Sequence, residues 1–450
     1  MRGVTKTAVL ALLGAGIATS LALVGDSPEP ELAPTSPQRP NVLIIVSDDQ
    51  RWGTLDTMPA TRRFFAHNGV KYSNAYVTSP LCCPSRASIL SGRYAHNHGV
   101  IRNDPDDALD YSRTIPAVLD QLGYRTAVVG KLSNAWQPSE TPPHFDEVLP
   151  KWRNPALAED DLARMAEGFI ASSKESDDVP WFMWLGARAP HMPLLPDPEH
   201  EGAAVDAPIS AGQIEADLSD KPAYLRSAVR DEERTSNGSF DFRSLTDEVD
   251  YEIGTRRELL SLDDMVASVH KALRDAGETR DTLAFYISDN GYMAGEHGGL
   301  ARKNLPYIEA IHVPMLMRWP GRVADGRRST SLVANIDIAP TVYDAVDVKP
   351  RYVTDGHSLL GGHERPYLLS ERLVGGHWSR FAGIVTRRLH YFENLTREGR
   401  TRTRELYNLG EDPYELENLD KVAPGAVEGE IEELHRLLRR ARRCAGTSCP

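Results

Sequence analysis

Four apolar segments of five to seven residues, separated by longer polar and helix-like stretches, constrain the fold of this chain most strongly. They are residues 41–47 (NVLIIVS), 125–129 (RTAVV), 181–186 (WFMWLG) and 283–288 (LAFYIS). Between the last two, residues 260–276 carry apolar side chains at helical spacing. Nearly continuous apolar strands that alternate with helices are typical of a mainly parallel sheet covered on both faces. The sequence therefore predicts an α/β domain.

Further parts of the chain differ from this pattern. Residues 196–251 are acidic, loop-rich and poorly periodic, and we interpret them as an insertion over one end of the sheet, where substrate choice is often made. After Ala345, residues 366–370 and 383–387 are candidate strands and residues 431–440 have an amphipathic helical pattern. We therefore predict a main domain over 41–345 and a smaller α+β domain over 346–450.

The N-terminus has the pattern of an export signal. Arg2 and Lys6 precede an apolar run over residues 7–24, and we predict a secretion signal over residues 1–25. The run is also near the shortest length that spans a membrane, so an uncleaved anchor is the alternative. Residues 26–40 are Pro-rich and predict an extended tether. We expect a secreted or extracytoplasmic protein with no membrane contact once the signal is removed.

Charge and cysteine content narrow the class of protein. The 450 residues include 51 Lys and Arg against 64 Asp and Glu, a formal net charge of −13, which argues against a nucleic-acid-binding face. A small anionic group needs only a few local cations. Export permits disulfides, so Cys444 and Cys449 are expected to close a small terminal loop, with two unpaired thiols as the alternative.

Potential ligands follow each of the four predicted strands, at the sheet edge where open α/β folds bind ligands. A single Asp after a strand is usually a turn or helix cap. Two such polar pairs are harder to dismiss, because carboxylates at one edge repel unless a cation neutralises them, and oxygen donors favour Ca²⁺ or Mg²⁺ over zinc. In chain order the residues are Asp48 and Asp49, Lys131, His191, and Asp289 and Asn290.

Residues 81–93 (LCCPSRASILSGR) contain a short helix bracketed by a proline and a glycine. Cys82 and Cys83 would lie at its N-terminus, where amide groups favour an oxyanion, and Arg86 would add a fixed positive charge. The alternatives are a buried cysteine pair, a disulfide to the C-terminus or a zinc ligand, although no CxxC spacing supports zinc.

This segment matches C-x-P-S-R-x-x-x-L-[ST]-G-R, and the chain resembles the formylglycine-dependent sulfatases there. The closest likeness is to the N-acetylglucosamine-6-sulfatase branch, in residues 81–100, 288–297 and 332–341. The resemblance extends over most of the chain from Arg39 onward, through NVLIIVSDDQ (41–50), GK (130–131), APHMP (189–193), SDNG (288–291), Lys303 and ELYNLGEDPYELENL (405–419).

The resemblance implies an alkaline-phosphatase-like fold, with a large mainly parallel mixed sheet sandwiched by helices and a smaller C-terminal α+β domain. It implies that a formylglycine-generating enzyme oxidises Cys82, and that the aldehyde hydrate attacks sulfur. Its second hydroxyl then lets sulfate leave, which a plain Ser or Cys cannot do. One Ca²⁺ would be held by the modified Cys82 together with Asp48, Asp49, Asp289 and Asn290.

The same resemblance assigns roles to four more side chains. Arg86 would hold the hydrated aldehyde, and Lys131 and Lys303 would bind sulfate oxygens. His191 would donate a proton to the leaving alcohol. Taken alone, each lysine is equally a solvated surface residue and His191 a structural loop residue.

The chain departs from the family at one position. Many sulfatases read G-K-x-H, but Gly130 and Lys131 are followed here by Leu, Ser and Asn134, as in the glucosamine-6-sulfatase-like branch. The base that deprotonates the hydrate is therefore open, with His98 and His297 as candidates.

These features predict a sulfuric ester hydrolase that removes sulfate from a sulfated sugar, with N-acetylglucosamine 6-sulfate as the expected substrate. A phosphodiesterase or phosphonate monoester hydrolase of the same superfamily is one alternative, because its substrates carry the same single negative charge. The other is a catalytically silent sugar-binding homologue that never receives formylglycine.

Overall fold

The computed structural model describes residues 39–103, 109–134, 141–150, 158–173, 179–227, 229, 245–324, 326–375 and 380–450. The predicted secretion signal, nearly all of the tether and part of the predicted insertion lie outside the described residues. Within the described part of the chain, no helix is both long and apolar enough to cross a membrane.

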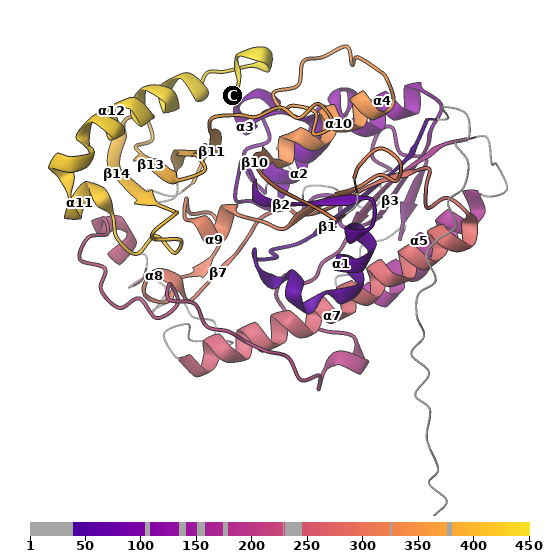
Figure 1. The fold of residues 1–450 in the computed structure, drawn as a ribbon, viewed down its shortest axis with the longest axis horizontal. Helices are drawn as coiled ribbons and strands as arrows, with labels where there is room; N and C mark the ends of the chain where they lie inside the picture. The colour runs from indigo at the N-terminus through magenta and orange to yellow at the C-terminus, as the bar shows by residue number, and fades with distance from the viewer. Residues whose placement is uncertain are drawn as a thin grey trace, which may run out of the picture. The chain divides into compact units, whose positions relative to one another are not determined.

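An eight-stranded mixed sheet forms the centre of the main domain (Figure 1). Within it, β9 runs antiparallel to its neighbours β2 and β6, while the other neighbouring strands are parallel. The predicted mainly parallel mixed sheet is therefore confirmed. In spatial order the strands are β10 (Arg327–Ala334), β2 (Gly69–Tyr76), β9 (Met315–Arg318), β6 (Thr282–Ser288), β1 (Asn41–Ser47), β5 (Trp181–Gly186), β3 (Arg125–Gly130) and β4 (Glu147–Leu149).

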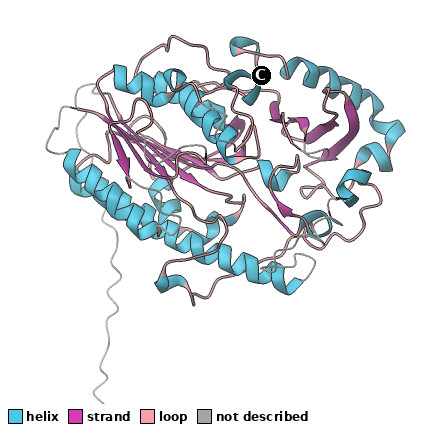
Figure 2. Cartoon of the chain, turned by 180° about the vertical axis from the view of Figure 1, so that it is seen from behind, coloured by secondary structure: helices cyan, strands magenta, loops and turns pink. Residues whose placement is uncertain are grey.

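Helices cover both faces of this sheet, because alternate residues of its central strands point to opposite sides. In β1, Leu43 and Ile45 pack toward one helical layer, whereas Val42, Ile44 and Val46 pack toward the other. Figures 1 and 2 show the two layers from opposite sides. The first layer contains α1 (Pro59–Ala66), α5 (Glu159–Ser173) and α7 (Leu245–Ala276), and the second α2 (Cys82–Ser91), α4 (Ile115–Gln121) and α10 (Ile338–Ala345).

The predicted elements agree closely with those observed. Strands β1 and β5 have the predicted bounds, β3 ends one residue later and β6 begins one residue earlier. The helix predicted over 260–276 is the last part of α7, which begins at Leu245. Residues 245–251, which the loop-rich pattern assigned to the insertion, therefore form its first turns.

The smaller C-terminal domain is built on a four-stranded antiparallel sheet, in the order β11 (Leu368–Arg372), β12 (Phe381–Val385), β13 (Leu389–Leu395) and β14 (Thr401–Asn408). The first strand begins two residues later than predicted, because Pro366 has no N–H for the ladder. The second ends at Val385, so the prediction that it reaches Arg387 was wrong. Helix α12 (Pro424–Ala441) buries one apolar stripe, which extends the helix predicted over 431–440 toward its N-terminus. The boundary at 345/346 stays a prediction.

The other short α-helices and strands of the described chain are α3 (Ala95–His98), β7 (Met293–Ala294), α8 (Glu296–Gly299), β8 (Ala301–Arg302), α9 (Ile308–Ile311) and α11 (Leu419–Val422). Short 3-10 helices lie at 54–57, 111–113, 198–200, 335–337 and 446–448.

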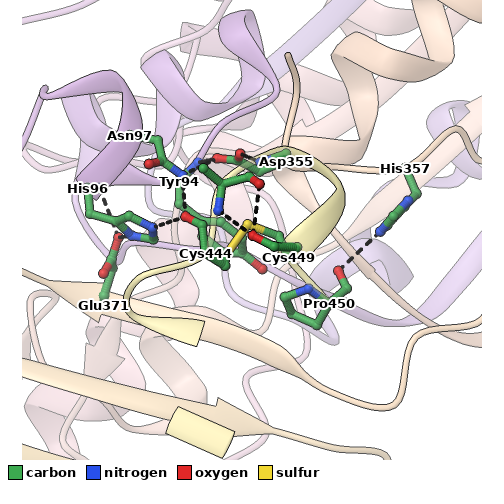
Figure 3. Close-up of a disulfide and its surroundings, with 12 residues drawn as sticks. Tyr94, His96, Asn97, Asp355, His357, Glu371, Cys444, Cys449 and Pro450 are labelled. Carbon is green, nitrogen blue, oxygen red and sulfur yellow. Dashed lines mark hydrogen bonds and ion pairs between the residues drawn. A yellow bond between two sulfur atoms is a disulfide. The ribbon is translucent and has the colours of Figure 1, made fainter. Parts of the chain in front are cut away.

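The predicted disulfide between Cys444 and Cys449 is confirmed, and it closes the last turn of the chain (Figure 3). The Cys444 carbonyl accepts hydrogen bonds from the side chains of His96 and Asn97, each at 2.9 Å. The other ring nitrogen of His96 lies 2.7 Å from the Glu371 carboxylate. Burial acts to lower the pKa of His96, but these two acceptors outweigh it and raise the pKa. The imidazole thus ties the chain end to α3.

Candidate active site

The candidate site lies at the C-terminal edge of the central sheet, where β1 and β6 end side by side. Ser47 pairs with Ser288 in register, so the polar pairs that follow these strands are brought together. The Asp289 N–H donates to the Ser47 carbonyl at 3.0 Å. Asp49 turns the chain sharply with a φ of 64°, in the left-handed region that an Asp side chain tolerates.

Three carboxylates and one thiol meet at this edge. Asp48, Asp49, Cys82 and Asp289 are buried, and each offers a ligand atom within 4.8 Å of the others. The Cys82 Sγ lies 3.7 Å from an Asp48 oxygen. Helix α2 supplies the thiol as its first residue, as the sequence predicted.

Asn290 tests whether these residues fit a hard cation. Its Nδ2 donates to Asp49 and to the Gly291 carbonyl, whereas its Oδ1 is buried without a hydrogen-bond partner. An unsatisfied buried oxygen is costly. Because Asn290 follows Asp289 and contacts Asp49, its Oδ1 can add a further oxygen to the donor set that Ca²⁺ prefers. The residues present therefore fit the predicted ion.

Three cations balance the acidic groups. Arg86 donates from Nε to Asp289 at 2.6 Å, Lys131 forms an ion pair with Asp48, and the Lys303 Nζ lies 2.5 Å from an Asp49 oxygen. Burial acts to raise the pKa of Asp48, but Lys131 and Arg86 outweigh it and the pKa is lowered. At Asp289 burial prevails over Arg86 and the pKa is raised. The site is thus a tightly coupled set of charges.

Cys82 lies in this set as a protonated thiol. Burial raises its pKa to about 12, although the Lys303 Nζ is only 2.9 Å from Sγ. The helix N-terminus and the lysine favour a thiolate, but desolvation is the larger effect. An unmodified Cys82 is therefore a poor nucleophile at neutral pH.

The ends of β3 and β5 fix Lys131. Gly186 is required there, because a Cβ on it would lie 1.9 Å from the Lys131 carbonyl oxygen. That oxygen accepts hydrogen bonds from Arg86 at 2.5 Å and from Trp184 Nε1 at 3.0 Å. Nothing in the sequence pattern indicates this role for Trp184, which is an apolar strand residue there.

His191 approaches the cluster from the solvent side. Its Nδ1–H donates to the Met192 carbonyl at 2.6 Å, and its Nε2 lies 3.7 Å from an Asp49 oxygen. The side chain is 35% exposed, which leaves Nε2 accessible from outside.

The two candidate bases for the hydrate have other partners. His98 lies 3.1 Å from the Ser88 hydroxyl and accepts the Val100 N–H at 3.0 Å, and burial lowers its pKa to about 3. His297 lies 2.6 Å from Glu215. Both imidazoles are therefore engaged in the fold.

The sequence also missed the role of Cys83. Its Sγ accepts the Asn134 N–H at 3.3 Å and lies 3.3 Å from the Ser133 hydroxyl. The second cysteine of the pair therefore anchors the loop that follows Lys131. Both cysteines are free thiols, so the alternative of a disulfide to the C-terminus was wrong.

A family comparison agrees with this geometry, since the model of the family described as sulfatase matches residues 40–348. The chain belongs to the sulfatase family. It is 32% identical over 367 residues to N-acetylglucosamine-6-sulfatase of Homo sapiens, covering 72% of this chain and 64% of the relative. It is 27% identical over 509 residues to an arylsulfatase of Volvox carteri, covering 92% and 76% of the two chains.

Solved structures share the fold of this sulfatase. A structure in complex with its substrate D-glucosamine-2-N,6-O-disulfate has a TM-score of 0.75 at 20% identity, covering 89% of this chain and 97% of the other. The predicted alkaline-phosphatase-like architecture is confirmed. This sulfatase spans 32% to 64% of the length of the first curated relatives, so their whole activities do not transfer directly.

Proposed function

We propose that this sulfatase hydrolyses the sulfate ester of a sulfated sugar, with N-acetylglucosamine 6-sulfate as the expected substrate, and that it uses formylglycine at position 82 and one Ca²⁺. The contact that carries the proposal is the Cys82 Sγ, 2.9 Å from the Lys303 Nζ and within 4.8 Å of ligand atoms on three carboxylates. Relatives named N-acetylglucosamine-6-sulfatase and the complex with a sulfated glucosamine support the substrate class.

Formylglycine and Ca²⁺ would each supply a different part of the chemistry. When formed, the formylglycine hydrate supplies the attacking oxygen that the buried thiol cannot supply. When bound, Ca²⁺ supplies positive charge next to the sulfate oxygens. Asp48, Asp49, Asp289 and Asn290 would hold the ion.

The lysines and the arginine have the charge to neutralise sulfate. Lys131 and Lys303 contact Asp48 and Asp49, which leaves them beside the thiol and ready to transfer their hydrogen bonds to sulfate oxygens. Arg86 is fully buried and fixed by Asp289 and the Lys131 carbonyl, so it acts as a rigid charge against the modified side chain.

His191 is the proposed proton donor to the leaving alcohol. Its Nδ1–H is held by the Met192 carbonyl, so a protonated ring presents Nε2–H toward the cluster. Partial exposure of the ring lets a sugar alcohol reach it.

Mass analysis of the peptide that carries Cys82 tests the modification, in protein from a host that makes the formylglycine-generating enzyme. Oxidation of the thiol to the aldehyde lowers the peptide mass. The same protein is then assayed on a panel of sulfated mono- and disaccharides. An unmodified thiol, or no desulfation by a modified protein, would refute the proposal, and the unmodified result would favour the silent sugar-binding homologue.

A second candidate function is phosphonate monoester or phosphate diester hydrolysis. The solved phosphonate monoester hydrolase of Agrobacterium radiobacter has a TM-score of 0.72 at 20% identity, covering 90% of this chain and 96% of that one. Turnover of an aryl sulfate compared with an aryl phosphate diester separates the two.

We also propose export of the protein, which relatives named as extracellular sulfatases in Drosophila melanogaster and Caenorhabditis elegans support. N-terminal sequencing of protein recovered from the culture medium tests export and locates any cleavage after the predicted signal.

A further inference from the structure

Four exposed arginines form a stripe at the C-terminal end of α12. Arg436, Arg439, Arg440 and Arg443 are spaced i, i+3, i+4 and i+7, which places them on one side of a helix. Arg443 lies past the end of α12 but continues its turn, because its N–H donates to the Arg440 carbonyl at 3.1 Å. We call these residues the arginine stripe. The helix buries its apolar stripe elsewhere, so the arginines are its free face.

A second basic segment adjoins the arginine stripe. Arg397 and Arg400 are exposed in the turn between β13 and β14. A Cβ on Gly399, between them, would lie 3.4 Å from a guanidinium nitrogen of Arg442. The turn therefore lies against the end of α12, although these residues are far apart in the sequence.

The arginine stripe is held in place on both sides. Toward the N-terminus, α12 packs into the core through residues such as Leu434 and Leu438. Toward the C-terminus, the disulfide loop is anchored by the His96 and Asn97 bonds to the Cys444 carbonyl and by a 2.7 Å bond from Gly446 N to Asp355 (Figure 3). A basic surface ordered in advance loses less conformational entropy on binding than a flexible tail.

Neighbouring acids do not neutralise the stripe. Arg404, on β14, pairs with Asp420 at 2.8 Å and Glu428 at 3.1 Å. Across the described chain, no carboxylate lies within ion-pair distance of an arginine of the stripe. The helix dipole favours one or two cations in a last turn, but like charges at i+3 and i+4 repel one another. The dipole also does not account for Arg397 and Arg400, of which Arg400 forms an exposed 4.0 Å ion pair with Glu398. The whole chain is acidic at −13.

We propose that the arginine stripe, with the β13–β14 turn, binds the anionic chain of a sulfated polysaccharide outside the active site. Guanidinium groups bind planar arrays of oxyanion oxygens with paired hydrogen bonds and remain charged at any physiological pH. Seven residues of helix extend about 10 Å, so the stripe can contact more than one sulfate group of a polymer. The choice of a sulfated polymer rests on the proposed function. Such binding would raise the concentration of substrate ends near the enzyme.

Retention on immobilised heparin, a sulfated polysaccharide, tests the proposal. The variant R436Q/R439Q/R440Q/R443Q removes the stripe. The matched control R62Q/R63Q/R327Q/R328Q removes four exposed arginines from α1 and β10, with the same change in net charge. We expect the stripe variant to elute at clearly lower NaCl than the wild type and the control. Its slope of log K against log salt should fall by about 3, if each lost contact counts as it does for other polyanions.

Kinetics give a second readout. We expect kcat and KM for a small sulfated monosaccharide to be unchanged in the stripe variant, whereas KM for a sulfated polymer rises severalfold. Unchanged retention, or equal loss in both variants, overturns the proposal. Binding to phosphatidylserine vesicles without binding to heparin overturns it in favour of a lipid surface. If the protein binds heparin but desulfates no substrate, the proposed function is refuted, whereas the proposed polyanion site is supported.

Discussion

Within the described residues, two clusters of side chains that could bind a metal lie in different surroundings. Asp48, Asp49, Cys82 and Asp289 form one, and His297, Glu309 and Glu415 form the other; in each, the ligand atoms lie within 4.8 Å. The carboxylates of the first cluster are balanced by Arg86, Lys131 and Lys303. All three cations lie within ion-pair distance of Asp48. In the second cluster, the carboxylates of Glu309 and Glu415 lie beside the imidazoles of His297 and His390.

Access separates the two clusters further. The first opens to solvent through the partly exposed side chains of Lys131 and His191. In the second, His297 is fully buried and Glu309 is 8% exposed.

The second cluster joins distant parts of the chain. Glu415, after β14, accepts the Ile308 N–H at 2.9 Å and lies 2.5 Å from His390 on β13. His297 lies 2.6 Å from Glu215 and 3.7 Å from Glu309 on α9. We infer that this cluster fastens the C-terminal domain and residue 215 to the loop that carries Lys303. Similar residues thus serve chemistry where substrate can enter and stability where it cannot.

The largest expected effect is at Cys82. Cys82→Ser should lower kcat by roughly 10³-fold or more, because a serine ester has no second hydroxyl to expel sulfate. Substrate binding should persist, as equilibrium binding of a sulfated monosaccharide would report. Cys83→Ser is the matched control, with activity within about tenfold of wild type. Near-normal turnover by Cys82→Ser would contradict the catalytic role of the first cluster.

His297→Gln should act on stability instead. Removing one partner of a buried charge pair costs about 3 kcal/mol, because the carboxylates stay buried. Urea unfolding measures this loss, while kcat at a temperature where the variant is folded should change little. A large kcat defect with unchanged unfolding would show that the second cluster belongs to the chemistry.

Lys303→Ala should lower kcat/KM by about 10²-fold, the usual cost of one lost donor to a developing oxyanion. Steady-state kinetics on a sulfated monosaccharide measures it. Lys271→Ala, which removes an exposed lysine paired with Asp275 on α7, is the control and should have no effect. Equal kinetic constants for the two variants would show that Lys303 has no role in catalysis.

Calcium should distinguish the clusters directly. At ten times its Kd, Ca²⁺ should stabilise the folded protein by about 1.4 kcal/mol, seen as a rise in Tm after chelator treatment and dialysis. Asp289→Asn should abolish the rise and His297→Gln should retain it. The reverse pattern would move the metal to the second cluster.

The smallest effect concerns pH. Burial acts to lower the pKa of His297, but the hydrogen bond to Glu215 and the nearby Glu309 carboxylate outweigh it and raise the pKa from 6.5 to about 10. The stabilisation is therefore complete below pH 6.5 and is lost as pH rises through 10. The stability gap between wild type and His297→Gln should shrink by about 1 kcal/mol from pH 7 to pH 8. A gap that is constant with pH would show that His297 is neutral.

The local sequence pattern was sufficient to predict much of the fold and the residues proposed to bind the metal. Apolar runs identified β1 and β5 to the residue, and parallel strands necessarily bring Asp48 and Asp289 to one edge. The antiparallel β9 was not predicted, since Met315–Arg318 is a short strand of three apolar residues and an arginine with no directional signal. Expected export together with the short spacing of Cys444 and Cys449 predicted their disulfide.

The amino-acid sequence by itself determined which segments are strands, which side chains follow them and the motif around Cys82, because periodicity and chain connectivity are local properties. Only the tertiary structure decided that Lys303 lies 2.9 Å from that thiol and that Trp184 holds the Lys131 carbonyl. It also decided the protonated state of the thiol, since desolvation depends on every element packed around it and on no single stretch of the chain.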